Sequence, residues 1–248
     1  MLWPLLCFVT FIAATVQSAL GFGFGLIAVA AFVVLFDSAQ AIQLVIILTF
    51  LMSLAHYPKL KLRNTGALLK PLIYSSLLGF PVGIWVYLSI DLSLLKTLIA
   101  ILLISLSGLS LYHIYQAKQP VSNIGPQSAA SPFMISLVGM IAGAMATSLA
   151  MPGPLVMLYL SSQRLEKDLV RALMSGFFIF SYFAALICQW LLVGIDLSTW
   201  KNALLLLPFA LLGTYVGHHI SRKISQQFFQ RLVLIILVSS GLFMLFNQ

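Results

Sequence analysis

Two apolar stretches of the chain are interrupted by residues that can present hydrogen-bond donors to a ligand. The first interruption reads QSALGFGFG over Gln17–Gly25, and the second reads TSLAMPGP over Thr147–Pro154. Alternating glycines leave the peptide N–H groups of the first stretch sterically open, and each stretch begins with amide or hydroxyl side chains. The candidate substrate-binding residues are therefore Gln17, Ser18, Gly21, Gly23, Gly25, Thr147, Ser148 and Gly153.

These interruptions are expected to form an anion site that contains no fixed charge. Pro152 ends one half-helix, and Pro154 suits the first turn of the next, where its missing N–H has no cost. A half-helix that starts after each interruption directs its positive N-terminal end and its unpaired N–H groups at the break. The alternative is that the glycines and small residues only allow helices to pack closely.

The composition places these segments in a membrane protein. Of the 248 residues, 61% are hydrophobic and only 7% are charged, and the mean hydropathy is +1.08. A soluble domain carries about 25% charged residues, so this chain cannot cover a water-facing surface. The net charge of +8 comes from Lys and Arg in short loops between apolar blocks, which is typical of membrane orientation. We expect a multi-pass protein whose partner is the lipid bilayer and which binds no nucleic acid.

The centres of the apolar blocks contain no Asp, Glu, Lys or Arg. Proton-coupled carriers usually bury a carboxylate there, and the chain also lacks metal-ligand spacing and a phosphate-binding loop. We therefore expect no cofactor, no metal and no nucleotide hydrolysis. An intramembrane serine protease would need a deep Ser–His pair, but all four His lie near block ends. The chain is predicted to be no enzyme and to have no catalytic residue.

The chain consists of two similar halves. Gly79 and Gly83 in LLGFPVG recur as Gly213 and Gly217 in LLGTYVG, at an offset of 134 residues, and each half opens with an interrupted segment. A stretch rich in Gln, Ser and Pro separates the halves. We predict a first transmembrane repeat over residues 1–116, a linker loop over 117–131 and a second repeat over 132–248. The repeated glycines lack polar neighbours and are interpreted as packing positions.

The basic residues indicate how the repeats cross the membrane. If each of eight apolar blocks crosses once, the 13 Lys and Arg divide 6 to 7 between the two sides. If the opening block of each half enters and leaves on one side, they divide 11 to 2, with Asp37, Asp91 and Asp196 on the side that is poor in Lys and Arg. This favours a re-entrant hairpin followed by three transmembrane helices in each half, and hence two inverted repeats. A broken but fully crossing opening helix is the alternative.

Other polar residues are weaker candidates for the same cavity. They either line it or hydrogen-bond to a neighbouring helix, and they are Ser53, His56, Ser175, Ser181 and Gln189. Arg171, just before the sixth block, either attracts an anion toward the entrance or anchors its helix according to the positive-inside rule.

The order of these features resembles the sulfite exporter TauE/SafE family of bacterial membrane permeases. The resemblance covers nearly the whole chain: two four-segment repeats, the opening run QSALGFGFGLIAVAAF, the Gly79–Gly83 pair with its counterpart, and the basic loop before the third segment. It implies transport, often export, of anionic sulfur compounds and small organic acids such as sulfite, organosulfonates and sulfoacetate. Carried over to this chain, it makes the two opening segments the permeation site.

We therefore expect an all-α polytopic membrane protein in the bacterial inner membrane, with both termini extracytoplasmic. The N-terminus lacks the basic region of a cleaved signal peptide and is expected to belong to the mature fold. The predicted function is that of a secondary transporter or facilitator that moves a small organic or sulfur-containing anion by alternating access. A passive anion channel on the same scaffold is the alternative, and a homo-oligomer is compatible with either.

Overall fold

The computed structural model describes residues 2–56, 66–116, 131–163, 165 and 167–220, together with residues 235, 238 and 242. The helices are α1 (Leu2–Leu20), α2 (Phe24–Phe36), α3 (Gln40–His56), α4 (Gly66–Ser89), α5 (Leu92–Gln116), α6 (Pro132–Leu149), α7 (Gly153–Ser162), α8 (Lys167–Cys188), the π-helix η2 (Gln189–Val193) and α9 (Leu197–Ile220). The predicted linker, apart from Ser131, and most of residues 221–248, which end the second predicted repeat, lie outside the described residues.

The described ranges confirm the all-α polytopic fold. Five helical stretches are long and apolar enough to cross a membrane, namely α1, α4, α6, the Leu169–Val193 stretch of α8 with η2, and α9. Shorter apolar helices are α2 and the stretches Gln40–Ala55 and Leu92–Ser105. These same ranges contain no strand.

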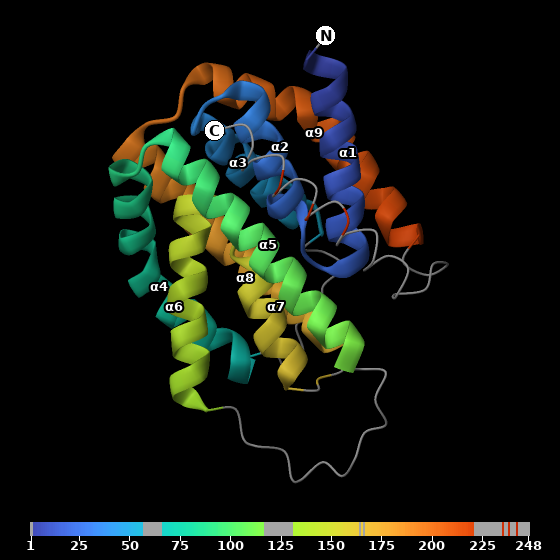
Figure 1. Cartoon of the computed structure of the whole chain (residues 1–248), viewed down its shortest axis with the longest axis vertical. Helices are drawn as coiled ribbons and strands as arrows, with labels where there is room; N and C mark the ends of the chain where they lie inside the picture. Colours follow the sequence, from blue (N-terminus) through green and yellow to red (C-terminus); the bar gives the residue numbers. More distant parts are fainter. Residues whose placement is uncertain are drawn as a thin grey trace.

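The opening segment of the first half is a broken helix that turns back on itself. Gly21 and Gly23, between α1 and α2, have φ angles of +89° and +118°. Residues with a Cβ rarely adopt such angles, so glycine allows the chain to turn here. In Figure 1, α1 runs from the N-terminus toward the middle of the molecule, and α2 returns beside it toward the same end.

A second broken helix opens the other half. α6 ends at Leu149, Ala150 takes a left-handed φ of +54°, and α7 begins at Gly153. Pro152 lies in the break and Pro154 lies in the first turn of α7, as the two prolines predict. Figure 1 shows α7 turning back toward the end at which α6 began.

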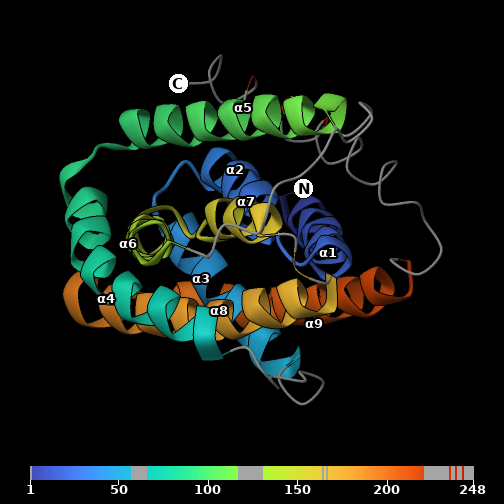
Figure 2. The ribbon, with the colours of Figure 1, turned by 90° about the horizontal axis from the view of Figure 1, so that it is seen from below.

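Each half packs against the opening helix of the other half. α4 of the first half lies against α6, and α9 of the second half lies against α1 (Figure 2). The repeated glycines form both contacts, because a Cβ on any of them would collide with the facing backbone. The atoms it would meet are the carbonyl oxygens of Met140 and Ala144 on α6, opposite Gly79 and Gly83, and of Phe11 and Thr15 on α1, opposite Gly213 and Gly217. The interpretation of these glycines as packing positions is confirmed.

Loops from both halves meet at one end of the molecule, which we call the Asp37 end (residues 36–41, 91–96 and 194–202). Asp37 forms an ion pair with Lys96 of α5 at 2.6 Å, and Gln40 Nε2 donates to Asp196 Oδ2 at 2.9 Å. Eight single crossings would put Asp37 and Asp196 on opposite sides of a membrane. Because Asp37 and Asp196 lie at the same end of the molecule, the structure agrees with the hairpin arrangement that the loop charges favour.

Candidate functional site

The two helix breaks meet around a small space, which we call the central cavity. Its volume is about 10 Å³, room for about one water molecule. It is lined by Gln17, Gly23, Gly25, Leu26, Met151, Gly153, Pro154, Phe178 and Tyr182. None of these residues is Asp, Glu, Lys, Arg or His, so its polar groups are backbone atoms, one amide and one phenol.

The N-terminal ends of α2 and α7 both face the central cavity. Gly23 is the N-cap of α2, Gly153 is the first residue of α7, and both line the cavity. The first N–H groups of a helix have no partner within it, and the aligned peptide dipoles place a partial positive charge there. The Phe24 N–H donates to Gln17 Oε1 at 3.2 Å, so one of these groups already has a partner. The N-terminal ends of α2 and α7 together are chemically suited to a small anion.

Glycine allows the two hairpins to touch. A Cβ on Gly25 would collide with the carbonyl oxygen of Ala150, at the end of α6. A Cβ on Gly153 would lie 2.9 Å from Phe178 Cζ and 3.2 Å from Phe22 Cβ. Since neighbouring atoms in a packed protein rarely come this close, larger residues would push the hairpins apart or fill the cavity.

Four of the eight candidate residues line the central cavity: Gln17, Gly23, Gly25 and Gly153. The other four lie close to the breaks but have different neighbours. The Ser18 hydroxyl donates to the Thr214 carbonyl oxygen on α9 at 2.7 Å. The Thr147 hydroxyl donates to the Phe80 carbonyl oxygen on α4 at 3.1 Å, and the Ser148 hydroxyl donates to the Ala144 carbonyl oxygen on α6 at 2.7 Å. Gly21 lies beside Arg171.

Arg171 places a positive charge beside the first break. Its Nη2 donates to the Ala19 carbonyl oxygen at 2.9 Å, and its Cγ lies 3.7 Å from the position that a Gly21 Cβ would take. The C-terminal end of a helix is negative, so the guanidinium stabilises the end of α1. Arg171 is also exposed, so its charge faces solvent near the central cavity. This position suits both alternatives considered from the sequence, a helix anchor and a residue that attracts an anion.

Phe178 and Tyr182 are cavity residues that the sequence analysis does not identify. They lie four residues apart on α8 and share one face of the helix, with ring centroids 5.7 Å apart. Tyr182 Oη donates to the Ala150 carbonyl oxygen at 2.8 Å, at the break between α6 and α7. Aromatic residues in an apolar helix also face lipid, so their type alone could not place them here.

Tyr182→Phe is expected to lower the free energy of unfolding by about 1 kcal/mol, because the Ala150 carbonyl loses its donor at a buried position. A thermal melt in detergent measures the loss as a lower melting temperature. Tyr74→Phe is the matched control, since Tyr74 is 66% exposed on α4 whereas Tyr182 is 2% exposed. Equal melting temperatures for the two variants would contradict this prediction.

The weaker candidates are absent from the residues that line the central cavity. Gln189 is fully buried, and its Nε2 donates to the Thr147 carbonyl oxygen at 3.0 Å. Its partner Gln43 on α3, whose Nε2 donates to Gln189 Oε1 at 3.1 Å, is a third residue that the sequence analysis does not identify. The chain offers a signal for it, because an amide within an apolar block needs a hydrogen-bond partner.

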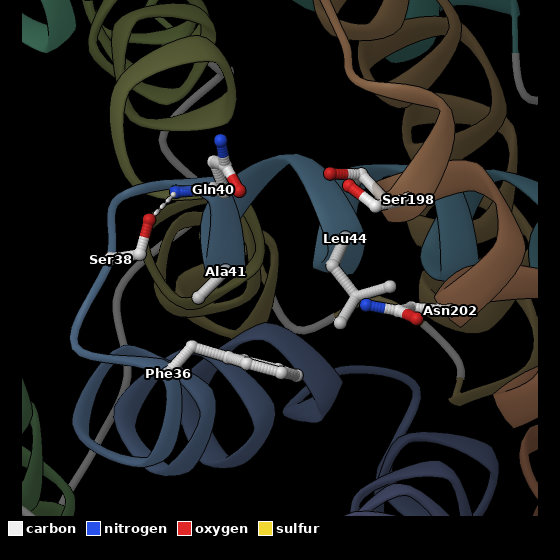
Figure 3. Close-up of a pocket in the computed structure, with 8 residues that line it drawn as sticks. Phe36, Ser38, Gln40, Ala41, Leu44, Ser198 and Asn202 are labelled. Carbon is white, nitrogen blue, oxygen red and sulfur yellow. Dashed lines mark hydrogen bonds between the residues drawn. The ribbon is translucent and has the colours of Figure 1, made fainter.

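A larger pocket opens at the Asp37 end, between the starts of α3 and α9 (Figure 3). We call it the Asp37-end pocket, and its volume is about 100 Å³. Its lining carries amides and hydroxyls but no charged side chain: Phe36, Ser38, Gln40, Ala41, Leu44, Ser198, Thr199 and Asn202. Ser38 caps the start of α3, where its Oγ accepts a hydrogen bond from the Gln40 N–H at 3.2 Å.

Comparison with known families connects this architecture to transport. The family model described as "Sulfite exporter TauE/SafE" matches residues 6–244, nearly the whole chain and both hairpins. The comparisons with curated proteins and with solved structures found no match. The match confirms the resemblance inferred from the repeats and the glycine-rich opening segment, and it supports a role in membrane transport. The chain therefore belongs to the sulfite exporter TauE/SafE family.

Proposed function

We propose that this chain is a secondary transporter or facilitator that moves a small oxyanion, such as sulfite, an organosulfonate or a carboxylate. The observation that carries the proposal is the meeting of two half-helix N-terminal ends at a cavity without charged side chains. An oxyanion accepts several hydrogen bonds at once, so it matches N–H groups that converge from two helices. The description of the family supports a sulfur oxyanion as the first substrate to test.

Binding at such a site is weak enough for transport. A helix N-terminus stabilises an anion by about 0.3–1 kcal/mol, and by up to ~2 kcal/mol where it is partly buried. The Gln17 amide adds its Nε2 donor, since its Oε1 already accepts from the Phe24 N–H. Release of the anion then breaks no buried ion pair. Arg171 raises the local concentration of anions near the break through its charge.

Alternating access is the mechanism that we propose. The central cavity of about 10 Å³ is too small for an oxyanion, so it widens before the substrate binds. The reciprocal contacts of α4 with α6 and of α9 with α1 support two inverted repeats in which each hairpin is held by the other half. Rocking of one half against the other would open the cavity to one side at a time.

The proposed location is the bacterial inner membrane, with the Asp37 end and the N-terminus outside the cytoplasm. Only Lys96 and Lys201, of the 13 Lys and Arg, belong to the loops assigned to this side. Lys96 is paired with Asp37, which further reduces the positive charge there. Positive charge concentrated at the other side is what the positive-inside rule expects of cytoplasmic loops.

Counterflow in liposomes tests the proposal. Liposomes that contain the purified protein are loaded with unlabelled sulfite, and uptake of radiolabelled sulfite is followed beside protein-free liposomes. We expect transient accumulation of label, saturation with concentration, and stronger competition by sulfoacetate or isethionate than by chloride at constant ionic strength. Flux that neither saturates nor shows counterflow would indicate the passive channel. No flux for sulfite, thiosulfate, sulfoacetate, taurine, isethionate, acetate or lactate would contradict the proposal.

A further inference from the structure

A pair of buried amides connects α3 to the end of α6 inside the helix bundle. Gln43 is 2% exposed and Gln189 is 0% exposed. Gln43 Nε2 donates to Gln189 Oε1 at 3.1 Å and to the Gly194 carbonyl oxygen at 2.9 Å, and Gln189 Nε2 donates to the Thr147 carbonyl oxygen at 3.0 Å. These two amides, which we call the amide chain, therefore join α3 of the first half to η2 and α6 of the second half.

One end of this amide chain lies next to the central cavity. Tyr182 of α8, which lines the cavity, precedes Gln189, the first residue of η2, by seven residues or about two helical turns, so the two side chains lie on the same side of this continuous helix. Tyr182 holds the Ala150 carbonyl oxygen and Gln189 holds the Thr147 carbonyl oxygen. Both carbonyls belong to the end of α6, at the break that forms one wall of the cavity.

The other end of the amide chain lies next to the Asp37-end pocket. Gln43 lies one turn after Gln40, which lines the pocket in Figure 3, so the two side chains lie on the same face of α3. Gly194 precedes Ser198, which lines the α9 side of the same pocket, by four residues. The amide pair therefore lies between the neighbourhood of a polar pocket at one end of the molecule and that of the proposed binding site.

The local backbone is unusual where Gln189 enters the amide chain. α8 continues there as the π-helix η2, which ends at Val193 and is followed by Gly194 with a φ of +85°. π-Helical turns are found frequently at functional sites. Polar groups are costly in the bilayer interior, and in membrane proteins they often mark the path of a substrate.

We propose that Gln43 and Gln189 line the route between the central cavity and the Asp37-end pocket, and that the hydrogen bond between them closes this route here. This inference rests on the proposed transport function, and it adds the path by which the anion passes between the central cavity and the Asp37 end. When the route opens, the amide N–H groups of Gln43 and Gln189 exchange their present acceptors for the oxygens of the passing anion. Uncharged amides can make this exchange without separating a buried ion pair.

Cysteine labelling tests the route without any substrate. Cys7 and Cys188 are replaced by Ala, and a single reporter is introduced as Leu26→Cys, which lines the central cavity and is 2% exposed. A membrane-impermeant maleimide is added to one side of the proteoliposome membrane at a time. In parallel, Ser198→Cys in the Asp37-end pocket identifies the compartment that this end faces.

With Gln43→Ala, we expect the Leu26→Cys reporter to be labelled about tenfold faster when the maleimide is on the side from which Ser198→Cys is labelled. A change of this size corresponds to the loss of the hydrogen bond that closes the route. Labelling from the opposite compartment stays unchanged. Ser107→Ala is the control, because Ser107 is a buried polar residue of α5 that lines neither pocket, and its hydroxyl donates within its own helix to the Leu103 carbonyl oxygen. This control should leave both labelling rates unchanged.

Unchanged labelling in Gln43→Ala, or equal acceleration from both compartments, would overturn the proposal, because the amides would then only hold helices together. Gln43→Asn keeps the amide but shortens it by one methylene, and it replaces Gln43→Ala if that variant does not fold. It should accelerate labelling from the same single compartment. Because labelling needs no substrate, failure of this test leaves the counterflow result intact, and failed counterflow leaves the labelling result valid.

Discussion

Gly25→Ala is expected to reduce sulfite counterflow to the level of protein-free liposomes. The added methyl group would collide with the Ala150 carbonyl oxygen in the break of the other hairpin. The Tyr182 hydroxyl already holds that oxygen at 2.8 Å, so the collision is relieved by moving α2 away from α6. Such a movement separates the two helix ends that are proposed to bind one anion together. Overpacking of this kind also lowers the free energy of unfolding by about 1–3 kcal/mol.

Gly108→Ala is the control for this experiment. A Cβ on Gly108, in α5, would have no atom of the described residues within 4 Å, so the methyl group meets no obstacle among them. Alanine is favoured over glycine inside a helix by about 0.8–1 kcal/mol, and this variant should retain counterflow and stability. Both variants are compared by membrane yield, size-exclusion profile and flux. Normal counterflow by folded Gly25→Ala protein would contradict a site formed by the two breaks.

The positions of both helix breaks could be predicted because the rules that produce them are local. Gly21 and Gly23 supply backbone angles that other residues avoid, and Pro152 and Pro154 exclude an uninterrupted helix while suiting the start of a new one. Loop charges likewise predict the hairpin arrangement, since they constrain which loops share a side of the membrane. The hydrogen bond between Gln40 and Asp196 agrees with that prediction.

The directions of the side chains could not be predicted in the same way. A membrane helix is apolar on all sides, so the sequence gives no hydrophobic face that would separate cavity from lipid or from neighbouring helix. The sequence therefore predicts Ser18 and Thr147 at the cavity, whereas their hydroxyls donate to α9 and α4. The position of Tyr182 could not be predicted either, because only the packing of α8 against the second break places its hydroxyl at Ala150.

Gly79→Ala and Gly213→Ala are each expected to lower the free energy of unfolding by about 3 kcal/mol, at the upper end of what overpacking usually costs. In both variants the new methyl group meets backbone of an opposing helix, which has no side-chain rotamer that could relieve the collision. Gly79 faces a carbonyl oxygen and, at 2.7 Å, the Ala144 nitrogen, so its variant should be the less stable of the two. Thermal melts and the yield of monodisperse protein measure both effects against Gly108→Ala.

The comparison between the two variants tests the reciprocal packing that the transport mechanism requires. Gly79 holds the first half against α6, and Gly213 holds the second half against α1, so each substitution loosens one hairpin from the opposite half. If the halves are inverted repeats that rock about these contacts, both variants lose stability and both lose counterflow. Loss in Gly79→Ala with wild-type behaviour in Gly213→Ala would mean that only one hairpin is held in this way. Access would then alternate about one fixed half, and the symmetric mechanism would be wrong.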